Sequence, residues 1–280
     1  MHPIIKTALY LGILTAILLV IGAIFGGIQG LTIAFIFALL MNGFAYFFSD
    51  KISLFFYKAK ELSSTENPKL HSIVEEVAKK AGIPKPKIFL VQNVSPNAFA
   101  TGRNPQNSVI AFTTGILSLL NDDELKGVIA HEMSHIKNRD ILIASIAGVI
   151  AGTIGYLAAM ARWSLFFGGD REGSRGNLVG IILLAILIPI ITLLIQLAIS
   201  RSREFAADET GSRFLGTSKG LESALAKLHL GVEKKPMDSA NQGTAHMFIV
   251  NPFSGKNFIN VFMTHPPIEE RIKRLQNMKF

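Results

Sequence analysis

Two histidines and a glutamate at a fixed spacing are the residues of this chain best suited to chemistry. The run from His131 to His135 reads His-Glu-Met-Ser-His. On a helix, residues i and i+4 share a face, so both imidazoles can reach one zinc ion at about 2.0–2.1 Å. Glu132 could then act on a water molecule at the metal instead of binding the metal. The alternative is a solvated helix face with ordinary polar residues.

A pair of acids could complete such a site. A catalytic zinc site needs a third protein ligand and an open position, and this chain has no cysteine to supply it. Glu204 and Asp208 are again four residues apart, so Glu204 could be the third ligand. Asp208 could hold a ligand histidine by its other ring nitrogen. Alternatively, both acids form surface pairs with Arg201 and Arg203.

The elements that must position these residues alternate with four uncharged segments. Charged residues make up 17% of the 280 residues, below the roughly 25% of a typical soluble domain. The uncharged segments are residues 7–28, 31–49, 141–161 and 177–200. About 20 apolar residues span a bilayer, so the pattern predicts an α-helical integral membrane protein. For the last two segments, a buried helix pair is the alternative.

The N-terminal region, residues 1–50, is predicted to be a transmembrane hairpin. Its first apolar run is too long for the hydrophobic part of a signal peptide, and a second run follows after a short Gly-Ile-Gln-Gly turn. The segments within residues 141–200 would form the second membrane region. The domain that carries the His-Glu-Met-Ser-His run would then consist of two parts, residues 51–140 and 201–280.

Basic residues at the segment ends predict the orientation. Eleven lysines and arginines stand near the ends on one side, and three stand on the other. By the positive-inside rule, the protein is expected to be multi-pass in the cytoplasmic (inner) membrane, with its active site facing the cytoplasm. The net charge of +8 then reflects orientation, and no recognisable nucleic-acid-binding module is present, so we expect no nucleic-acid partner.

The two soluble parts are predicted to form a mainly α, α+β domain with a small edge-exposed sheet. Asn121 and Glu124 form a plausible capping box at the start of the helix that carries His131. We expect residues 231–256 to be a long loop. The other predicted elements are strands at 87–92 and 108–113, an extended edge at 95–102, and helices at 69–82, 202–215, 218–230 and 266–278.

Spacing also predicts where the metal lies. His135 is six residues before the third uncharged segment, about 9 Å along a continuous helix. Glu204 is four residues after the fourth segment, about 6 Å on the same basis. The site should therefore lie near the cytoplasmic face of the bilayer.

Three runs of sequence together resemble a known family. They are His-Glu-Met-Ser-His from residue 131, Ser-Arg-Ser-Arg-Glu-Phe-Ala-Ala-Asp from residue 200, and Thr-His-Pro-Pro-Ile-Glu-Glu-Arg from residue 264. The combination is similar to the HtpX family of membrane zinc metalloproteases, which is related to the Ste24-type CAAX prenyl proteases. The resemblance extends to residues 97–102 and to the N-terminal hairpin, so it covers essentially the whole chain.

The resemblance implies a zincin-like (gluzincin) domain with one Zn²⁺ per chain. It implies that His131, His135 and Glu204 hold the ion and that Glu132 is catalytic. The implied activity is endopeptidase cleavage of misfolded or damaged membrane proteins at the cytoplasmic side of the membrane. The partners would be polypeptide substrates and the lipid bilayer; the sequence gives no indication of the oligomeric state.

Two further roles are predicted for residues outside the ligand set. Peptide hydrolysis needs a donor to the tetrahedral oxyanion, and His265 is the candidate by elimination among the remaining histidines. The alternative is a turn residue that caps the last helix. A substrate could add as a strand along the edge formed by Asn97, Ala98, Phe99 and Ala100, a reading that the family resemblance favours. The alternative is an edge strand that binds no ligand.

Two other functions remain as alternatives. One is a dedicated processing protease of the CAAX prenyl type, for which many spans enclosing a chamber would be expected. The other is a non-catalytic membrane scaffold or transporter with a vestigial metal site. Transporters usually place ionisable residues within their spans, and the four uncharged segments have none.

Overall fold

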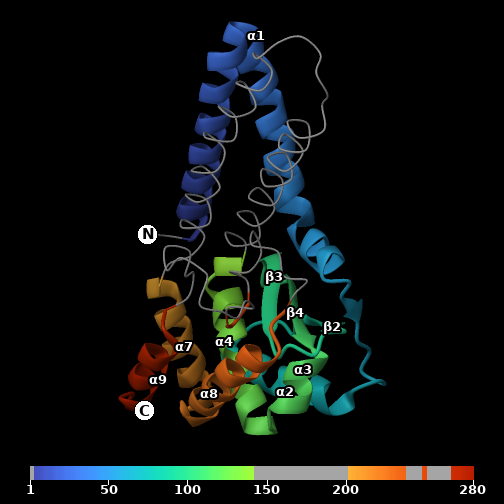
Figure 1. Cartoon of the computed structure of the whole chain (residues 1–280), viewed down its shortest axis with the longest axis vertical. Helices are drawn as coiled ribbons and strands as arrows, with labels where there is room; N and C mark the ends of the chain where they lie inside the picture. The colour runs from blue at the N-terminus through green and yellow to red at the C-terminus, as the bar shows by residue number, and fades with distance from the viewer. Residues whose placement is uncertain (1–2, 142–200, 238–247, 251–265) are drawn as a thin grey trace.

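The computed structural model describes residues 3–141, 201–237, 248–250 and 266–280. His265 and nearly all of the third and fourth uncharged segments lie outside these residues. In Figure 1, a long helical hairpin stands on one side of a domain of helices around a small sheet. The elements are α1 (Pro3–Phe56), β1 (Lys60–Glu61), α2 (Pro68–Ala81), β2 (Lys87–Val91), β3 (Ala98–Asn104), β4 (Asn107–Thr113), α3 (Thr114–Leu119), α4 (Asp122–Lys137), α7 (Arg201–Leu215), α8 (Lys219–Lys234) and α9 (Ile268–Gln276).

Helix α1 folds back on itself at the predicted glycine turn. Gly27 has φ 55° and ψ −138°, a backbone conformation that residues other than glycine rarely adopt. Gly22 and Gly30 then face each other so closely that a Cβ on either would collide with the other's carbonyl oxygen. The two arms therefore run antiparallel, as Figure 1 shows.

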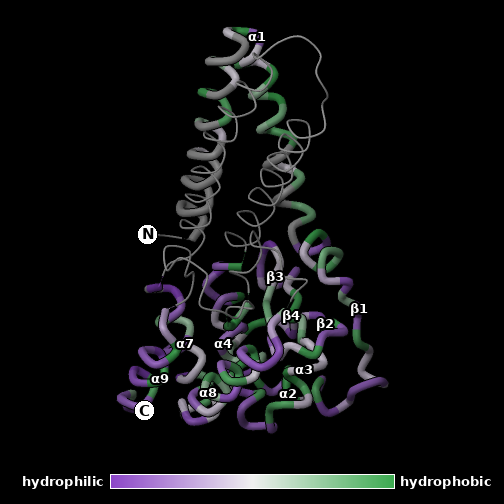
Figure 2. The backbone as a smooth tube through the Cα atoms, in the orientation of Figure 1, coloured by the Kyte–Doolittle hydropathy of each residue, from purple (hydrophilic) through white to green (hydrophobic). Residues whose placement is uncertain are grey.

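Apolar side chains remain exposed along the second arm of α1. Leu39 and Leu40 are 64% and 66% exposed, and Figure 2 shows green, hydrophobic residues along this arm above a more mixed domain. Over the described residues, a search by length and hydropathy finds no helix that qualifies as a membrane span. The membrane-spanning role of the hairpin stays a prediction.

The sheet is mixed, with strand order β1-β2-β4-β3. Strands β2 and β4 are parallel, with Ile88 opposite Ile110, whereas β3 pairs antiparallel with β4 and places Ala100 opposite Ile110. The predicted strands at 87–92 and 108–113 are therefore present, and the predicted edge at 95–102 falls on β3. The two-residue strand β1 and the short helix α3 were not predicted.

Helix α4 lies at the centre of the domain and packs against α2, α7, α8 and β3. Its side chains are buried on nearly all sides, with Val128, Ile129, Met133 and Ile136 at 0% exposure. Burial of an apolar side chain of this size contributes about 1.5–3 kcal/mol, so α4 is fixed from every direction. A side chain on α4 therefore has a well-defined position relative to α7 and β3.

The helices around α4 broadly follow the predicted pattern. Gly82 caps the C-terminal end of α2, as expected from the sequence. It has φ 69°, and its N–H donates to the carbonyl oxygens of Ala78 and Lys79. Helix α8 continues to Lys234, so the prediction that a loop begins at residue 231 is wrong. Val232 is 4% exposed in the main core, and this burial extends the helix beyond Leu230.

Candidate metal centre

The two histidines of the His-Glu-Met-Ser-His run lie on one face of α4. The helix begins with the predicted capping box: Asn121 accepts from the Glu124 amide, and the Glu124 side chain accepts from the Asn121 amide. Two turns further along, the Nε2 atoms of His131 and His135 are 3.3 Å apart. Their rings stand at 89° to each other. The short distance between the two Nε2 atoms allows both to reach one metal ion.

Helix α7 brings Glu204 to the same position. Its carboxylate oxygens lie 3.7 Å from Nε2 of His131 and 3.4 Å from Nε2 of His135. The close packing of α7 on α4 requires a glycine at position 211, because a Cβ there would meet the backbone of Ala130 and His131 at 2.8 Å. Two helices separated by a long stretch of sequence thus contribute to one cluster.

Both ring nitrogens that face away from the cluster contact carboxylates. Nδ1 of His131 is 2.8 Å from Oδ1 of Asp208, one turn after Glu204 on α7. Nδ1 of His135 is 3.3 Å from Oδ2 of Asp140. A carboxylate on Nδ1 fixes the ring tautomer and leaves Nε2 free to bind a metal.

Arg271 on α9 closes the buried side of this arrangement. Its side chain has 0% exposure, and it donates to both oxygens of Asp208, from Nε at 2.8 Å and from Nη2 at 2.7 Å. Burial raises the pKa of Asp208, but the Arg271 charge and the hydrogen bonds outweigh this effect and leave that pKa below its ordinary value. Asp208 is therefore a carboxylate when it contacts His131.

The two histidines differ in their protonation in the metal-free protein. Burial lowers the pKa of His131. Burial also opposes protonation of His135, but hydrogen bonds to Asp140 and Glu204 outweigh it and raise the pKa of His135 to about 10. The proton on His135 supplies the positive charge that the carboxylates of Asp140 and Glu204 favour.

Glu132 lies beside the cluster without joining it. Its side chain is 3% exposed, and burial raises its pKa to about 7, although the positive charge of His135 and a backbone hydrogen bond from Ala100 oppose the rise. A buried carboxyl group with a pKa near neutrality can take up and release a proton under physiological conditions.

The donor set and its geometry fit a zinc ion. The ligand atoms of His131, His135 and Glu204 all lie within 4.8 Å of one another. Two ligands at about 2.0–2.1 Å from a tetrahedral ion are about 3.3 Å apart, close to the measured 3.3, 3.4 and 3.7 Å. Two imidazoles and one carboxylate form a known ligand set of catalytic zinc, with the fourth position open.

Comparison with known proteins identifies the family. Residues 64–279 match peptidase family M48. The chain belongs to peptidase family M48. M48 peptidases are zinc-dependent metalloproteases, and this chain is accordingly a metalloprotease.

Relatives of this M48 peptidase match it over nearly its whole length. A "Protease HtpX homolog" from Pyrococcus furiosus is 54% identical over 98% of this chain and 95% of the relative. Another, from Syntrophobacter fumaroxidans, is 50% identical over 98% of each chain. These matches confirm the resemblance to the HtpX family that the sequence motifs indicated.

The fold of this M48 peptidase is similar to a solved structure, that of Ste24p from S. mikatae. The similarity has a TM-score of 0.54 at 20% sequence identity and covers 97% of this chain. The chain spans 64% of the Ste24p chain. At this identity the similarity concerns the fold alone.

The predicted substrate edge of this M48 peptidase is buried. Asn97, Ala98, Phe99 and Ala100 are between 0% and 6% exposed. A segment of the same chain, residues 248–250, lies along them: Ile249 donates to the Ala98 carbonyl at 3.1 Å, and Asn97 donates to the Val250 carbonyl at 2.9 Å. The outer edge of β3 is therefore already bonded within the chain at residues 97–99, where an open edge was expected.

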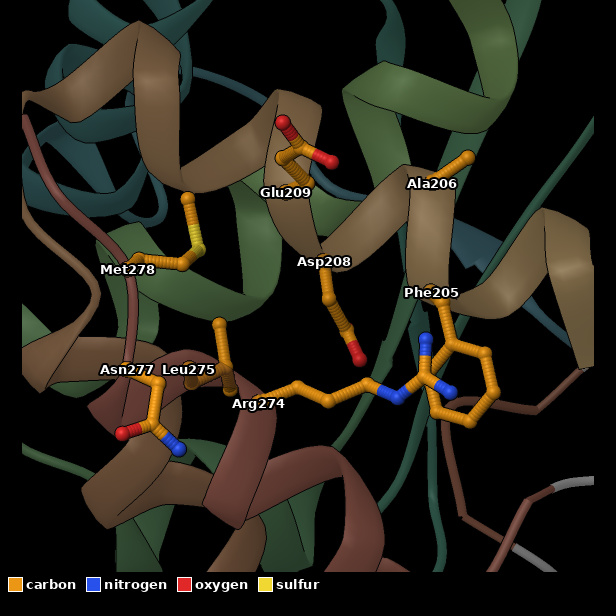
Figure 3. Close-up of a pocket in the computed structure, with 8 residues that line it drawn as sticks. All are labelled: Phe205, Ala206, Asp208, Glu209, Arg274, Leu275, Asn277 and Met278. Carbon is orange, nitrogen blue, oxygen red and sulfur yellow. The ribbon is translucent and has the colours of Figure 1, made fainter.

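A cavity between α7 and α9 lies next to the cluster. It has a volume of about 700 Å³. Figure 3 shows the residues that line it, with the Arg274 guanidinium against the Phe205 ring. The guanidinium carbon lies 3.6 Å from the centre of that ring. Asp208 borders this cavity, whereas His131, His135 and Glu204 are not among its lining residues. The cavity is therefore separate from the position where the three ligand atoms converge.

Two residues of the M48 site were missed by sequence reasoning. Arg271 lies in the Thr-His-Pro-Pro run that was used only to establish the resemblance, and a buried arginine cannot be told from a surface one by helix periodicity. Asp140 follows His135 by five residues, outside the i+3 and i+4 spacings that indicate a shared helix face. It reaches His135 because the chain continues one turn beyond the end of α4.

Proposed function

We propose that this protein is a membrane-bound zinc endopeptidase that cleaves misfolded or damaged membrane proteins on the cytoplasmic side. The observation that carries the catalytic part is the convergence of His131, His135 and Glu204 on one position beside Glu132. We propose these three as the ligands of one zinc ion per chain. Asp208 supports His131 from behind, at 2.8 Å.

When bound, the zinc ion would act as a Lewis acid on the scissile carbonyl and make water a nucleophile near neutral pH. Glu132 takes a proton from the attacking water and later passes it to the leaving amine. Burial disfavours the charged form of Glu132 and raises its pKa, which suits a group that must both accept and donate a proton. His265 remains our proposed donor to the oxyanion.

We propose that substrate is held in extended form along β3. Because residues 248–250 already bond to residues 97–99, a substrate can add there only if this segment moves, or else pairs further along β3. Asn97–Ala100 therefore remain the proposed substrate edge. Strand β3 stays buried through Gly102 and becomes partly exposed at Arg103 and Asn104.

The membrane part of the proposal rests on the sequence and on the relatives. The uncharged segments and the distribution of basic residues favour an inner-membrane protein with the site in the cytoplasm. In the sequence, α4 ends four residues before the third segment, and the described part of α7 follows directly after the fourth. This arrangement supports a site close to the membrane face. The similarity to Ste24p concerns the fold alone, so it does not favour a dedicated prenyl-protein protease.

Proteolysis by the full chain in detergent tests the catalytic proposal. With one equivalent of zinc, the protein should cleave unfolded casein, and a chelator should stop cleavage until zinc is restored. Glu132→Gln should lower the rate by about 10²–10⁴-fold while zinc remains bound, because the general base is lost and the ligands are intact. Glu209→Gln, at an exposed position on α7, is the matched control and should cleave normally.

Two results would contradict this proposal. Cleavage that survives Glu132→Gln would exclude Glu132 as the base. No cleavage by the zinc-loaded native protein would favour the scaffold alternative.

Cysteine labelling tests the orientation, because the chain has no cysteine of its own. A single cysteine at Glu233, which is exposed on α8, should stay unlabelled by an impermeant reagent in intact cells and become labelled after lysis. Labelling in intact cells would place the protease domain outside the cytoplasm.

A further inference from the structure

Arg271 is the largest fully buried side chain among the described residues, and the proposed reaction assigns it no role. It comes from the C-terminal helix α9 and makes two hydrogen bonds to the Asp208 carboxylate, at 2.7 and 2.8 Å. Its remaining terminal nitrogen, Nη1, donates to the Ile249 carbonyl at 2.9 Å. A charge at such depth is costly unless it is paired, and the Asp208 carboxylate pairs with this guanidinium through two hydrogen bonds.

The position of Arg271 allows two opposite effects on a metal ion. Its Nη1 is 3.8 Å from Oε2 of Glu204, so a cation there acts against a second cation at the ligands. Its two bonds to Asp208 act the other way, because they hold the carboxylate that fixes the His131 ring. The Asp208 contacts are short and bidentate, whereas the Glu204 contact is beyond hydrogen-bond length. The geometry therefore favours the effect that passes through Asp208.

We propose that Arg271 is a positioning residue of the metal centre, which strengthens zinc binding by fixing Asp208 and, through it, the ring of His131. The proposal rests on the proposed function in one respect, that His131 is a zinc ligand. It makes α9, a helix that carries no ligand, part of the metal site. Bidentate pairing explains why an arginine stands here: the fork holds both carboxylate oxygens, which the single ammonium group of lysine cannot do.

A purely structural role is the alternative. Through Ile249, Arg271 also anchors residues 248–250 against β3. If anchoring were its whole contribution, loss of Arg271 would reduce stability and leave the ligands of a folded protein unchanged. The measurement must therefore report on the metal and must show whether the effect passes through Asp208.

Zinc affinity of the full-length protein in detergent provides this measurement, by competition with a chromophoric chelator. Arg271→Met should weaken zinc binding by about 10–100-fold, the effect usual for a group that orients a ligand. Arg274→Met makes the same substitution on the same helix, at a side chain that is 56% exposed, and should leave the affinity unchanged. Arg271→Lys should fall between Arg271→Met and the native protein, because it keeps the charge but loses the fork.

A double-mutant cycle with Asp208→Asn shows the route of the effect. If Arg271 acts through Asp208, Arg271→Met should change zinc affinity little in the Asp208→Asn protein. Visible spectra of the cobalt-substituted proteins should show an altered ligand field in Arg271→Met and Arg271→Lys and an unaltered one in Arg274→Met. Because Asp208→Asn and Arg271→Lys conserve volume, they keep the test valid should Arg271→Met not fold.

Unchanged or tighter zinc binding in Arg271→Lys or Arg271→Met would overturn the inference, and so would full additivity with Asp208→Asn. Neither result would affect the proposed function. Failure of the native protein to bind one zinc ion would instead overturn the proposed function itself, so the two failures are distinguishable.

Discussion

The surroundings of the two histidines on α4 differ although the residues are only one helical turn apart. His131 is 1% exposed at its side chain, and the carboxylate behind it is neutralised by Arg271. His135 is 15% exposed, and the carboxylate behind it, Asp140, is equally exposed and lies at the longer distance of 3.3 Å. One imidazole is held in a closed, charge-balanced network, and the other faces a more open one.

The difference explains how one short motif can hold one imidazole firmly and still leave the position between the two histidines accessible. The pKa values of the two histidines differ in the same way. Burial lowers the pKa of His131, whereas the carboxylate neighbours of His135 raise its pKa to about 10. The closed side should contribute most to the position of the metal. The open side should contribute less, and it adjoins the segment that leads out of α4.

Removal of the proposed ligand that lies next to both histidines, Glu204, should have the largest effect. The Glu204 carboxylate lies within 3.7 Å of both Nε2 atoms. Glu204→Gln therefore removes the charged group that lies next to both imidazoles. Zinc affinity should fall by more than the 10–100-fold typical of groups outside the ligand set, and casein cleavage should cease. Equilibrium dialysis against zinc measures the loss; retention of one tightly bound zinc ion would exclude Glu204 as a ligand.

Matched substitutions behind the two histidines should have unequal effects. Asp208→Asn should weaken zinc binding by about 10–100-fold, because it disturbs a buried carboxylate held by Arg271. Asp140→Asn should weaken it by less than about 10-fold, because water can replace part of this longer, more exposed contact. Chelator competition on both variants gives the comparison directly, and equal losses would show that the closed and open sides do not differ.

The pH dependence of stability in the metal-free protein should also separate the two histidines. The pKa of His135 is higher in the folded protein, about 10, than the ordinary 6.5, so its contribution is fully present below pH 6.5 and is lost as pH rises towards 10. The pKa of His131 is lower when folded, so its contribution has the opposite sign and increases as pH rises to 6.5.

His135→Gln should therefore flatten the fall in stability between about pH 6.5 and 10, whereas His131→Gln should not. Thermal unfolding of the chelated protein across this range measures the difference, which we expect to be of the order of 2–4 °C per kcal/mol of lost stability. Similar pH profiles for the two variants would contradict the assigned difference in protonation.

The sequence predicted the parts of the site that depend on local spacing. Helical spacing places His131 beside His135 and Glu204 beside Asp208 wherever α4 and α7 lie, and the capping box at Asn121 marks where α4 begins. The strands and the glycine turn of α1 follow from equally local signals. The contact of Asp208 with His131 required the additional idea that a ligand histidine needs a partner on its second nitrogen.

Other parts could not be predicted because they depend on packing between distant segments. Nothing in the sequence near Arg271 indicates that it is buried against Asp208, 63 residues earlier. The cover that residues 248–250 provide for β3 lies in a stretch without clear periodicity, which was predicted to be a loop. The end of α8 was misplaced because the stretch from Gly231 lacks clear periodicity, whereas packing of Val232 in the core extends the helix.

The link from Arg271 through Asp208 to His131 also has a consequence for biosynthesis. Arg271 and His131 stand 140 residues apart in the chain, and α9 follows both α4 and α7. During synthesis, α4 exists long before α7, and α9 is completed last. A growing chain can therefore present two imidazoles to a metal but cannot form the locked centre until α9 has been made, so full metal affinity, and with it peptide hydrolysis, should arise only then.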